Sequence, residues 1–163
     1  MNFDSSVHKS GILILCIMVE LSCKSEYAIL ALLELAAHYN EGEPLQIRSI
    51  ASQQNIPDRY LEQLLATLRR GGVIRSQRGA KGGYLLAREP WKITLLEILN
   101  CLEGADMDRS ENNSTTKTLE SAVVFEVWQE AREIANSVLQ KYTLQDLTER
   151  LNARRQLDIM YYI

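Results

Sequence analysis

Two short helical patterns separated by a proline break constrain this fold more than any other feature of the chain. The first covers residues 46–54 and the second residues 58–70, and each repeats apolar residues at helical spacing along one face. Asn55-Ile56-Pro57 separates them, and proline is tolerated in the first turn of a helix, so Pro57 can open the second one. Two helices joined by so few residues predict a helix-turn-helix.

Glycines stop the second helix and then shape the segment that follows. Two β-prone runs, residues 73–77 and 84–87, flank a glycine-bearing loop at residues 78–83. A loop of this kind between such runs predicts a β-hairpin, which would be the wing of a winged helix-turn-helix. The loop does not match the phosphate-binding pattern of nucleotide-binding proteins, because Lys81 precedes the glycine pair and a strand follows.

The flanking segments predict further helices. Residues 25–39 carry an amphipathic pattern rich in alanine and leucine. Thr94 can cap a helix over residues 95–102, which Gly104 is expected to end. A polar, turn-rich segment at residues 105–117 predicts a loop.

A long helix with a broad apolar face is predicted over residues 118–142, followed by an amphipathic helix at 143–155 and an apolar tail at 157–163. The apolar face either packs within one protomer or meets a second copy of the chain. The neighbouring helix-turn-helix favours the second alternative, because such modules usually read two half-sites as symmetric dimers. The candidate dimerisation residues are Val123, Val127, Trp128, Ala131, Ile134 and Val138.

Charge is segregated along the chain, although the formal net charge is only −3. Residues 48–92 hold nine basic and three acidic side chains, whereas residues 103–133 hold eight acidic and three basic ones. These blocks are either two solvated faces or a basic working surface next to an acidic segment with another role. A basic winged helix-turn-helix is typical of DNA-binding proteins.

The DNA contacts are expected on the helix-turn-helix and on the wing. The first turns of its second helix would enter the major groove, where glutamine can pair with adenine and glutamate can accept from cytosine. Wing cations would reach a minor groove or the phosphates, and wing glycines would let the backbone approach DNA. The candidate residues are Arg48, Ser49, Arg59, Tyr60, Glu62, Gln63, Arg69, Arg78, Gly79, Lys81 and Tyr84.

Catalytic and metal-binding patterns are weak. The two histidines, His8 and His38, have no serine or cysteine nucleophile at a matching spacing. The three cysteines, Cys16, Cys23 and Cys101, form neither a closed disulfide framework nor a C-x-x-C pair. The sequence therefore predicts no enzyme activity, no cofactor and no metal site.

An apolar run at residues 12–19 lies near the start of the sequence. It is shorter than the about 20 apolar residues that a membrane span needs, and no small-residue cleavage site of a signal peptide follows it. We interpret residues 1–18 as an N-terminal extension, with residues 1–17 upstream of the native start at Met18. We expect a cytoplasmic protein without a membrane partner.

The motif residues resemble those of a known family. Residues 60–65 (YLEQLL), 68–73 (LRRGGV), Arg78-Gly79 and 82–88 (GGYLLAR) are similar to the signature of the Rrf2 family of bacterial winged helix-turn-helix regulators. This family includes regulators of iron–sulfur cluster assembly, of the nitric-oxide response and of cysteine metabolism. The resemblance covers about residues 19–104, since residues 21–32 also match the usual start of the family.

The resemblance implies a homodimer that binds a partly palindromic operator and represses or activates transcription. It places family DNA contacts at Arg59, Tyr60, Glu62 and Gln63, and at the wing residue Arg78. Arg59 stands where relatives can carry a small polar residue, so the operator bases contacted at this position are expected to differ from those of the relatives.

The chain departs from the family at the cluster-binding loop. Cluster-binding members carry three cysteines between the winged domain and the dimerisation helix, whereas residues 103–117 contain none. Glu26 matches a position where some relatives place a carboxylate ligand, but iron–sulfur clusters need about three or four soft ligands. A member without a cluster is therefore expected. The alternatives are a redox or metal sensor with unorthodox ligands such as Cys23, and an interaction module controlled by a partner enzyme through residues 103–133.

The predicted fold class is mainly α with a small β-hairpin, a winged helix-turn-helix followed by a long dimerisation helix. The expected divisions are the extension at 1–18, the winged domain at 19–104, the loop at 105–117, and the dimerisation and C-terminal helices at 118–163. The expected partners are a double-stranded DNA operator, a second copy of the chain, and a regulatory protein or small ligand.

Overall fold

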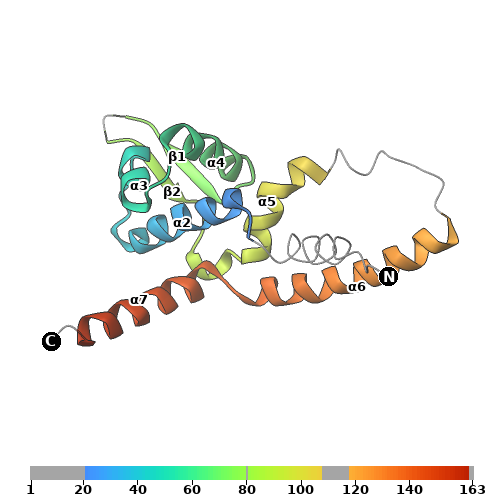
Figure 1. The fold of residues 1–163 in the computed structure, drawn as a ribbon. Helices are drawn as coiled ribbons and strands as arrows, with labels where there is room; N and C mark the ends of the chain where they lie inside the picture. The colour runs from blue at the N-terminus through green and yellow to red at the C-terminus, as the bar shows by residue number, and fades with distance from the viewer. Residues whose placement is uncertain (1–20, 80, 108–117, 162–163) are drawn as a thin grey trace, which may run out of the picture.

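The computed structural model describes residues 21–79, 81–107 and 118–161, and within these ranges it confirms a mainly helical fold with one β-hairpin. Figure 1 shows a winged unit and a pair of long helices that extend from it. The winged unit contains α2 (Cys23–Ala37), η1 (Tyr39–Glu41), α3 (Ile47–Gln54), α4 (Asp58–Arg70), β1 (Ile74–Gln77) and β2 (Gly83–Leu86). The remaining elements are η2 (Pro90–Lys92), α5 (Leu95–Met107), α6 (Leu119–Lys141) and α7 (Leu144–Tyr161).

Two of the sequence predictions concern residues outside these ranges. The N-terminal extension at residues 1–18 is one of them, and most of the predicted loop, residues 108–117, is the other. Within the described residues, no helix combines the length and the apolar character that crossing a membrane requires.

Side-chain caps set the starts of several helices. The Ser22 hydroxyl accepts a hydrogen bond from the backbone N–H of Ser25 at 3.1 Å, so α2 begins at Cys23, two residues before the predicted start. Thr94 caps α5 as predicted, because its Oγ1 accepts from the backbone N–H of Glu97 at 3.2 Å. Thr118 caps α6 in the same manner.

Two helices extend beyond their predicted ends. The helix expected to stop at Gly104 continues to Met107, because a helical glycine costs only about 1 kcal/mol relative to alanine and still donates its backbone N–H. The last helix was expected to end at Arg155, but α7 continues to Tyr161 and includes most of the predicted apolar tail. No proline or glycine separates Arg155 from Tyr161, so nothing in the sequence breaks the helix there.

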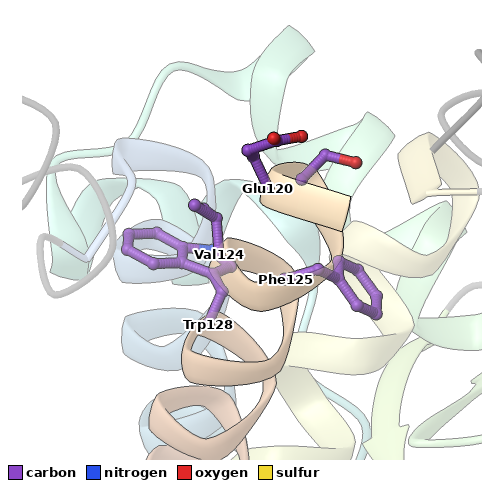
Figure 2. Close-up of a pocket in the computed structure, with 5 residues that line it drawn as sticks. Glu120, Val124, Phe125 and Trp128 are labelled. Atoms are coloured by element: carbon purple, nitrogen blue, oxygen red, sulfur yellow. The ribbon is translucent and has the colours of Figure 1, made fainter. Parts of the chain in front are cut away.

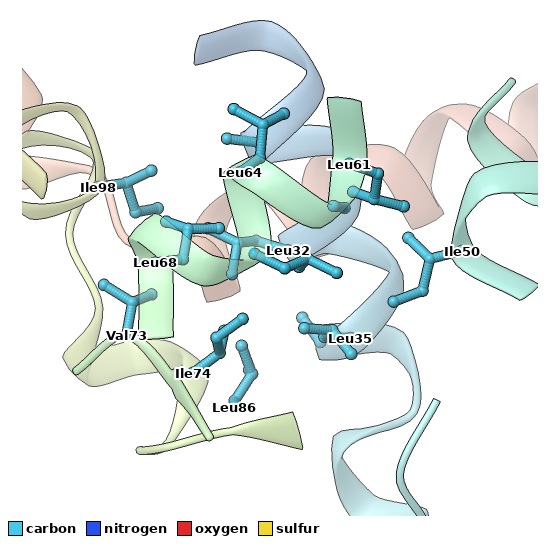
Figure 3. Close-up of a cluster of buried hydrophobic side chains, with 14 of the residues drawn as sticks. Leu32, Leu35, Ile50, Leu61, Leu64, Leu68, Val73, Ile74, Leu86 and Ile98 are labelled. Atoms are coloured by element: carbon cyan, nitrogen blue, oxygen red, sulfur yellow. The ribbon is translucent and has the colours of Figure 1, made fainter. Parts of the chain in front are cut away.

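The core lies between α4, α2 and the hairpin (Figure 3). Four leucines on one face of α4 pack against leucines of α2, against Ile50 of α3, and against residues of the strands and α5. Each buried leucine contributes about 1.5–3 kcal/mol relative to an exposed one. The buried cluster includes Leu32, Leu35, Ile50, Leu61, Leu64, Leu65, Leu68, Val73, Ile74, Leu86 and Ile98.

The hairpin is fixed on both sides of β2. Antiparallel pairing with β1 places Ile74 opposite Leu86 and Gln77 opposite Gly83. On the other side, Leu45 and Tyr84 exchange two backbone hydrogen bonds of 3.0 and 2.8 Å. The base of the wing is thereby attached to the segment that enters α3.

The junction of α6 and α7 is attached to the winged unit by backbone hydrogen bonds. The N–H of Leu95 donates to the carbonyl of Tyr142 at 2.9 Å, and the N–H of Leu144 donates to the carbonyl of Ile93 at 2.8 Å. Leu144 is fully buried in the same core. The C-terminal end of α6 therefore has a fixed position relative to α5.

We expect Gly83→Ala to lower the free energy of unfolding by about 1–3 kcal/mol, the usual cost of overpacking a site. A β-carbon at residue 83 would lie 2.3 Å from the backbone oxygen of Leu45, which cannot move without breaking the bridge to β2. Urea titration measures the change. Gln77→Ala, at the exposed position opposite Gly83, should change stability by less than about 0.5 kcal/mol; equal effects of the two substitutions would contradict the packing argument.

Candidate nucleic-acid interface

One face of α4 is fixed in the core, and this orients the opposite face outward. The buried leucines recur three and four residues apart, from Leu61 to Leu68. Arg59, Gln63 and Arg70 follow the same spacing on the other side of the helix, and all three are exposed. The structure thus presents a polar and basic face along α4, which we call the outer face (Arg59, Gln63 and Arg70).

Arg70 was missing from the residues predicted to contact DNA. It lies eleven residues after Arg59, which is three helical turns, and its guanidinium donates to the Thr67 hydroxyl at 3.2 Å. Helical periodicity applied to Arg59 and Gln63 would have found it.

The first turn of α3 lies beside the start of α4 and the base of the wing. Arg48 and Ser49 are both exposed in that turn. A groove of about 440 Å³ joins the three elements, and its lining residues are Gln46, Ile47, Arg48, Asp58, Glu62, Gly82, Gly83 and Tyr84. Three of the predicted contact residues, Arg48, Glu62 and Tyr84, therefore converge on one groove.

The tip of the wing carries Arg78, Gly79 and Lys81, all exposed. Gly79 has a φ of 121°, a conformation that residues with a side chain rarely adopt. Gly82 closes the turn by donating its N–H to the carbonyl of Gly79 at 2.9 Å. The glycines predicted to shape the wing do so through this turn.

Tyr60 and Tyr84 are partly buried, unlike the other predicted contact residues. The Tyr60 ring packs edge-on against Tyr27 of α2, with ring centroids 5.8 Å apart. Tyr84 packs against the core, and its backbone is hydrogen-bonded to the backbone of Leu45. Both tyrosines therefore position the surface as well as contribute to it.

Arg69 lies between α4 and β1, where its guanidinium is 3.4 Å from the Ser76 hydroxyl. It also borders a second groove of about 520 Å³ on the α2 side of α4. Tyr60 and Gln63 line the same groove, so three further predicted residues lie together there.

The cations of this surface are not neutralised by the rest of the described chain. Two other cations that follow the hairpin do form ion pairs, Arg88 with Glu97 and Lys92 with Glu89. No described carboxylate forms an ion pair with the basic side chains at the surface. These cations are Arg48, Arg59, Arg69, Arg70, Arg78 and Lys81.

Cys101 supports α4 from behind. Its thiol donates to the carbonyl of Thr67 at 3.4 Å, and Gly71 leaves the space that the sulfur occupies. Burial raises the pKa of the Cys101 thiol, an effect that the charge of nearby Glu97 reinforces.

The described residues do not fit a metal cluster. Nowhere in the described ranges do three histidine, cysteine or acidic side chains form a group that could hold a metal ion. Cys101 is engaged with Thr67 inside the fold, whereas Cys23 is exposed at the start of α2. An iron–sulfur cluster needs about three or four thiolate or comparable ligands, and this donor set does not supply them.

A separate apolar surface covers α6. The side chains of Val123, Val127, Ile134 and Val138 are 55%, 62%, 61% and 46% exposed. None of the described side chains of α6 is fully buried, so the rest of the described chain does not cover this face, contrary to the alternative of packing inside the protomer. Ala131 is also exposed, and Trp128 is partly buried.

Figure 2 shows the N-terminal part of this surface. Val124, Phe125 and Trp128 project from neighbouring turns of α6, and Glu120 lies one turn before them. They line an apolar hollow of about 640 Å³.

The arrangement defines a class of protein. A helix-turn-helix with an outward second helix, followed by a basic hairpin, is the architecture of winged helix-turn-helix DNA-binding proteins. Residues 21–150 match the Rrf2 family, which is described as an iron-dependent transcriptional regulator. The chain belongs to this family. It is a DNA-binding transcriptional regulator, and members of the family are regulators rather than enzymes.

Relatives and solved structures agree with this assignment. Slr0846 of Synechocystis, provisionally named an HTH-type transcriptional regulator, is 39% identical over 129 residues, covering 79% of this chain and 87% of that protein. The regulator CymR of Bacillus subtilis is 35% identical over 147 residues, covering 89% of this chain and 100% of that protein. The structure of IscR from T. potens matches with a TM-score of 0.66 and 36% identity, covering 81% and 88% of the two chains. The structure of CymR, titled the global cysteine regulator of B. subtilis, gives a TM-score of 0.64 and 36% identity, covering 80% and 97%.

We expect Cys101 to react with a thiol reagent more slowly than Cys23 in the folded protein, in a Cys16→Ser background. A raised pKa lowers the thiolate fraction at a given pH, and the thiolate is the nucleophile. Absorbance with Ellman's reagent at mildly alkaline pH gives the two rates, and Cys23→Ser and Cys101→Ser assign them. The difference should vanish in concentrated guanidinium chloride. Equal rates in the folded protein would mean that Cys101 is not protected by the fold.

Proposed function

We propose that this chain acts as a homodimer on a two-fold related operator in duplex DNA, without an iron–sulfur cluster. The outer face of α4 enters the major groove, while cations of α3 and of the wing contact the backbone on either side. The observation that carries this proposal is the unpaired basic surface on α3, α4 and the wing, built around an outward-facing α4. The protein acts on chromosomal DNA, which makes it a cytoplasmic regulator.

The homodimer is supported by the apolar face of α6. Contiguous exposed apolar surface on a soluble protein usually marks an interface. A second copy would supply an identical helix, and a symmetric pair of α6 helices would cover Val123, Val127, Ile134 and Val138 on both. Such a dimer would also present two α4 helices, one for each half-site of the operator.

The absence of a cluster is supported by the ligand chemistry. The chain has three cysteines in all, and residues 102–163 contain none. The sulfur of Cys101 belongs to the packing behind α4. In this proposal DNA binding responds to a small ligand, to a partner protein or to no signal, rather than to a bound cluster.

Fluorescence anisotropy tests the proposed function directly. Purified protein, analysed for metal, is titrated onto duplex DNA from its own upstream region and onto a scrambled duplex, at several salt concentrations. We expect preference for the upstream duplex and a linear fall of log affinity with log salt, with a slope of about −0.9 per phosphate contacted. Failure to bind any duplex more tightly than scrambled DNA, including duplexes selected from a random library, would refute the proposal.

We expect Arg78→Ala to weaken operator binding by about 1–3 kcal/mol, because the wing tip presents this unpaired guanidinium to DNA. Arg154→Ala is the matched control, since it removes the same charge from an exposed position on α7. Anisotropy on the same duplex compares the two. An unchanged affinity of Arg78→Ala would remove the wing from the interface.

We expect the double substitution Val127→Glu and Ile134→Glu to give monomers that bind the operator poorly. Burying two carboxylates in an apolar interface carries a large desolvation cost, so the dimer would dissociate. Light scattering measures the mass against the 18.6 kDa of one chain. Gln140→Glu adds a carboxylate to exposed α6 surface outside the apolar face and should leave the dimer intact. A double variant that stays dimeric would place the interface elsewhere.

A further inference from the structure

Arg59 belongs to the proposed interface. It is the second residue of α4, on the outer face and therefore opposite the buried leucines. The N-terminal residues of a recognition helix are those that reach base edges. The position of Arg59 thus directs its guanidinium to the floor of the major groove.

Two carboxylates beside Arg59 argue against a phosphate as its target. Asp58 precedes it and Glu62 follows it one turn later, and both are exposed. Carboxylates repel phosphates, whereas they are tolerated at base edges, where they can accept from cytosine. Neither forms an ion pair with Arg59 among the described residues, so the guanidinium remains available.

Phosphate contacts have other donors on this surface. Arg48 lies on α3, and Arg78 and Lys81 lie on the wing, so cations flank the start of α4 on two elements. The 440 Å³ groove links α3, α4 and the base of the wing into one continuous surface. These cations are placed to hold the DNA backbone, which leaves Arg59 on the outer face to reach the bases.

We propose that Arg59 reads a guanine in each half-site by donating two hydrogen bonds to its O6 and N7 atoms, an inference that rests on the proposed function. A bidentate arginine on guanine is the commonest specific contact in the major groove. Gln63 lies one turn further along the same face, about 6 Å along the helix axis. Since base pairs are spaced about 3.4 Å apart, an adenine read by Gln63 would lie about two base pairs from this guanine.

Selection from a random duplex library identifies the bases that each protein reads. The wild type should enrich a site with a guanine in each half, and Arg59→Ser should lose the preference for that base while keeping the rest of the site. Arg70→Ala is the matched control, because it removes a guanidinium from the same face at the far end of α4. It should weaken binding to all sites and leave the guanine preference unchanged.

Base analogues then test the two hydrogen bonds on the selected operator. Changing the guanine pair to adenine–thymine should weaken wild-type binding by about 5- to 150-fold and leave Arg59→Ser nearly unaffected. Substituting 7-deazaguanine removes only N7, and it should weaken the wild type and Arg70→Ala to the same extent but not Arg59→Ser. Inosine keeps both O6 and N7, so it should bind like guanine.

The outcomes separate this inference from the proposed function. A guanine preference that survives in Arg59→Ser, or a uniform loss of affinity on all sequences, would overturn the role of Arg59 while specific DNA binding stands. A wild-type protein that enriches no sequence would overturn the proposed function itself. Loss of the guanine preference in Arg59→Ser alone, with equal sensitivity to 7-deazaguanine in Arg70→Ala and the wild type, would establish the contact.

Discussion

Burial of the leucine face of α4 is the constraint on which the rest of the structure depends. Leu61, Leu65 and Leu68 are completely buried, and Leu64 nearly so. A rotation of α4 that hid Arg59 would expose leucines, at about 1.5–3 kcal/mol each. The apolar core therefore determines which side chains face outward, and the chemistry of the outer face follows from packing on the opposite side.

Backbone hydrogen bonds extend this fixed geometry to both neighbours of α4. Leu45 holds the base of the wing through Tyr84, so the wing cations have a defined place beside the helix. Ile93 and Leu95 hold the junction of α6 and α7. In the proposed dimer, a shift of α6 would therefore move the winged unit with it, because the two are joined at α5 and at this junction.

Local sequence signals predicted much of this arrangement. The bounds of α4 are those expected, from Asp58 to Arg70, and no end of a hairpin strand differs from the prediction by more than one residue. Some predictions failed because they relied on a single residue. Gly104 was expected to end α5, but the free-energy cost of a glycine in a helix is small compared with the stabilisation that α5 gains by packing. Arg70 was missed because helical periodicity was not applied to Arg59 and Gln63, which share its face. Tyr60 was predicted to contact DNA, and the structure adds that its ring packs edge-on against Tyr27.

The sequence by itself determined the class of fold and the basic surface. The spacing of apolar residues, the glycines and prolines that end helices, and the charges are local properties, and they can be identified without knowing which distant segments are in contact. Only the tertiary structure decided that the rest of the described chain leaves the apolar face of α6 exposed, since an amphipathic stripe has the same sequence pattern whether it packs inside the protomer or against another chain. The tertiary structure also decided the backbone bridge between Leu45 and Tyr84 and the packing of the Cys101 side chain against Gly71. Both depend on backbone approaches between segments far apart in the chain, which no local pattern encodes.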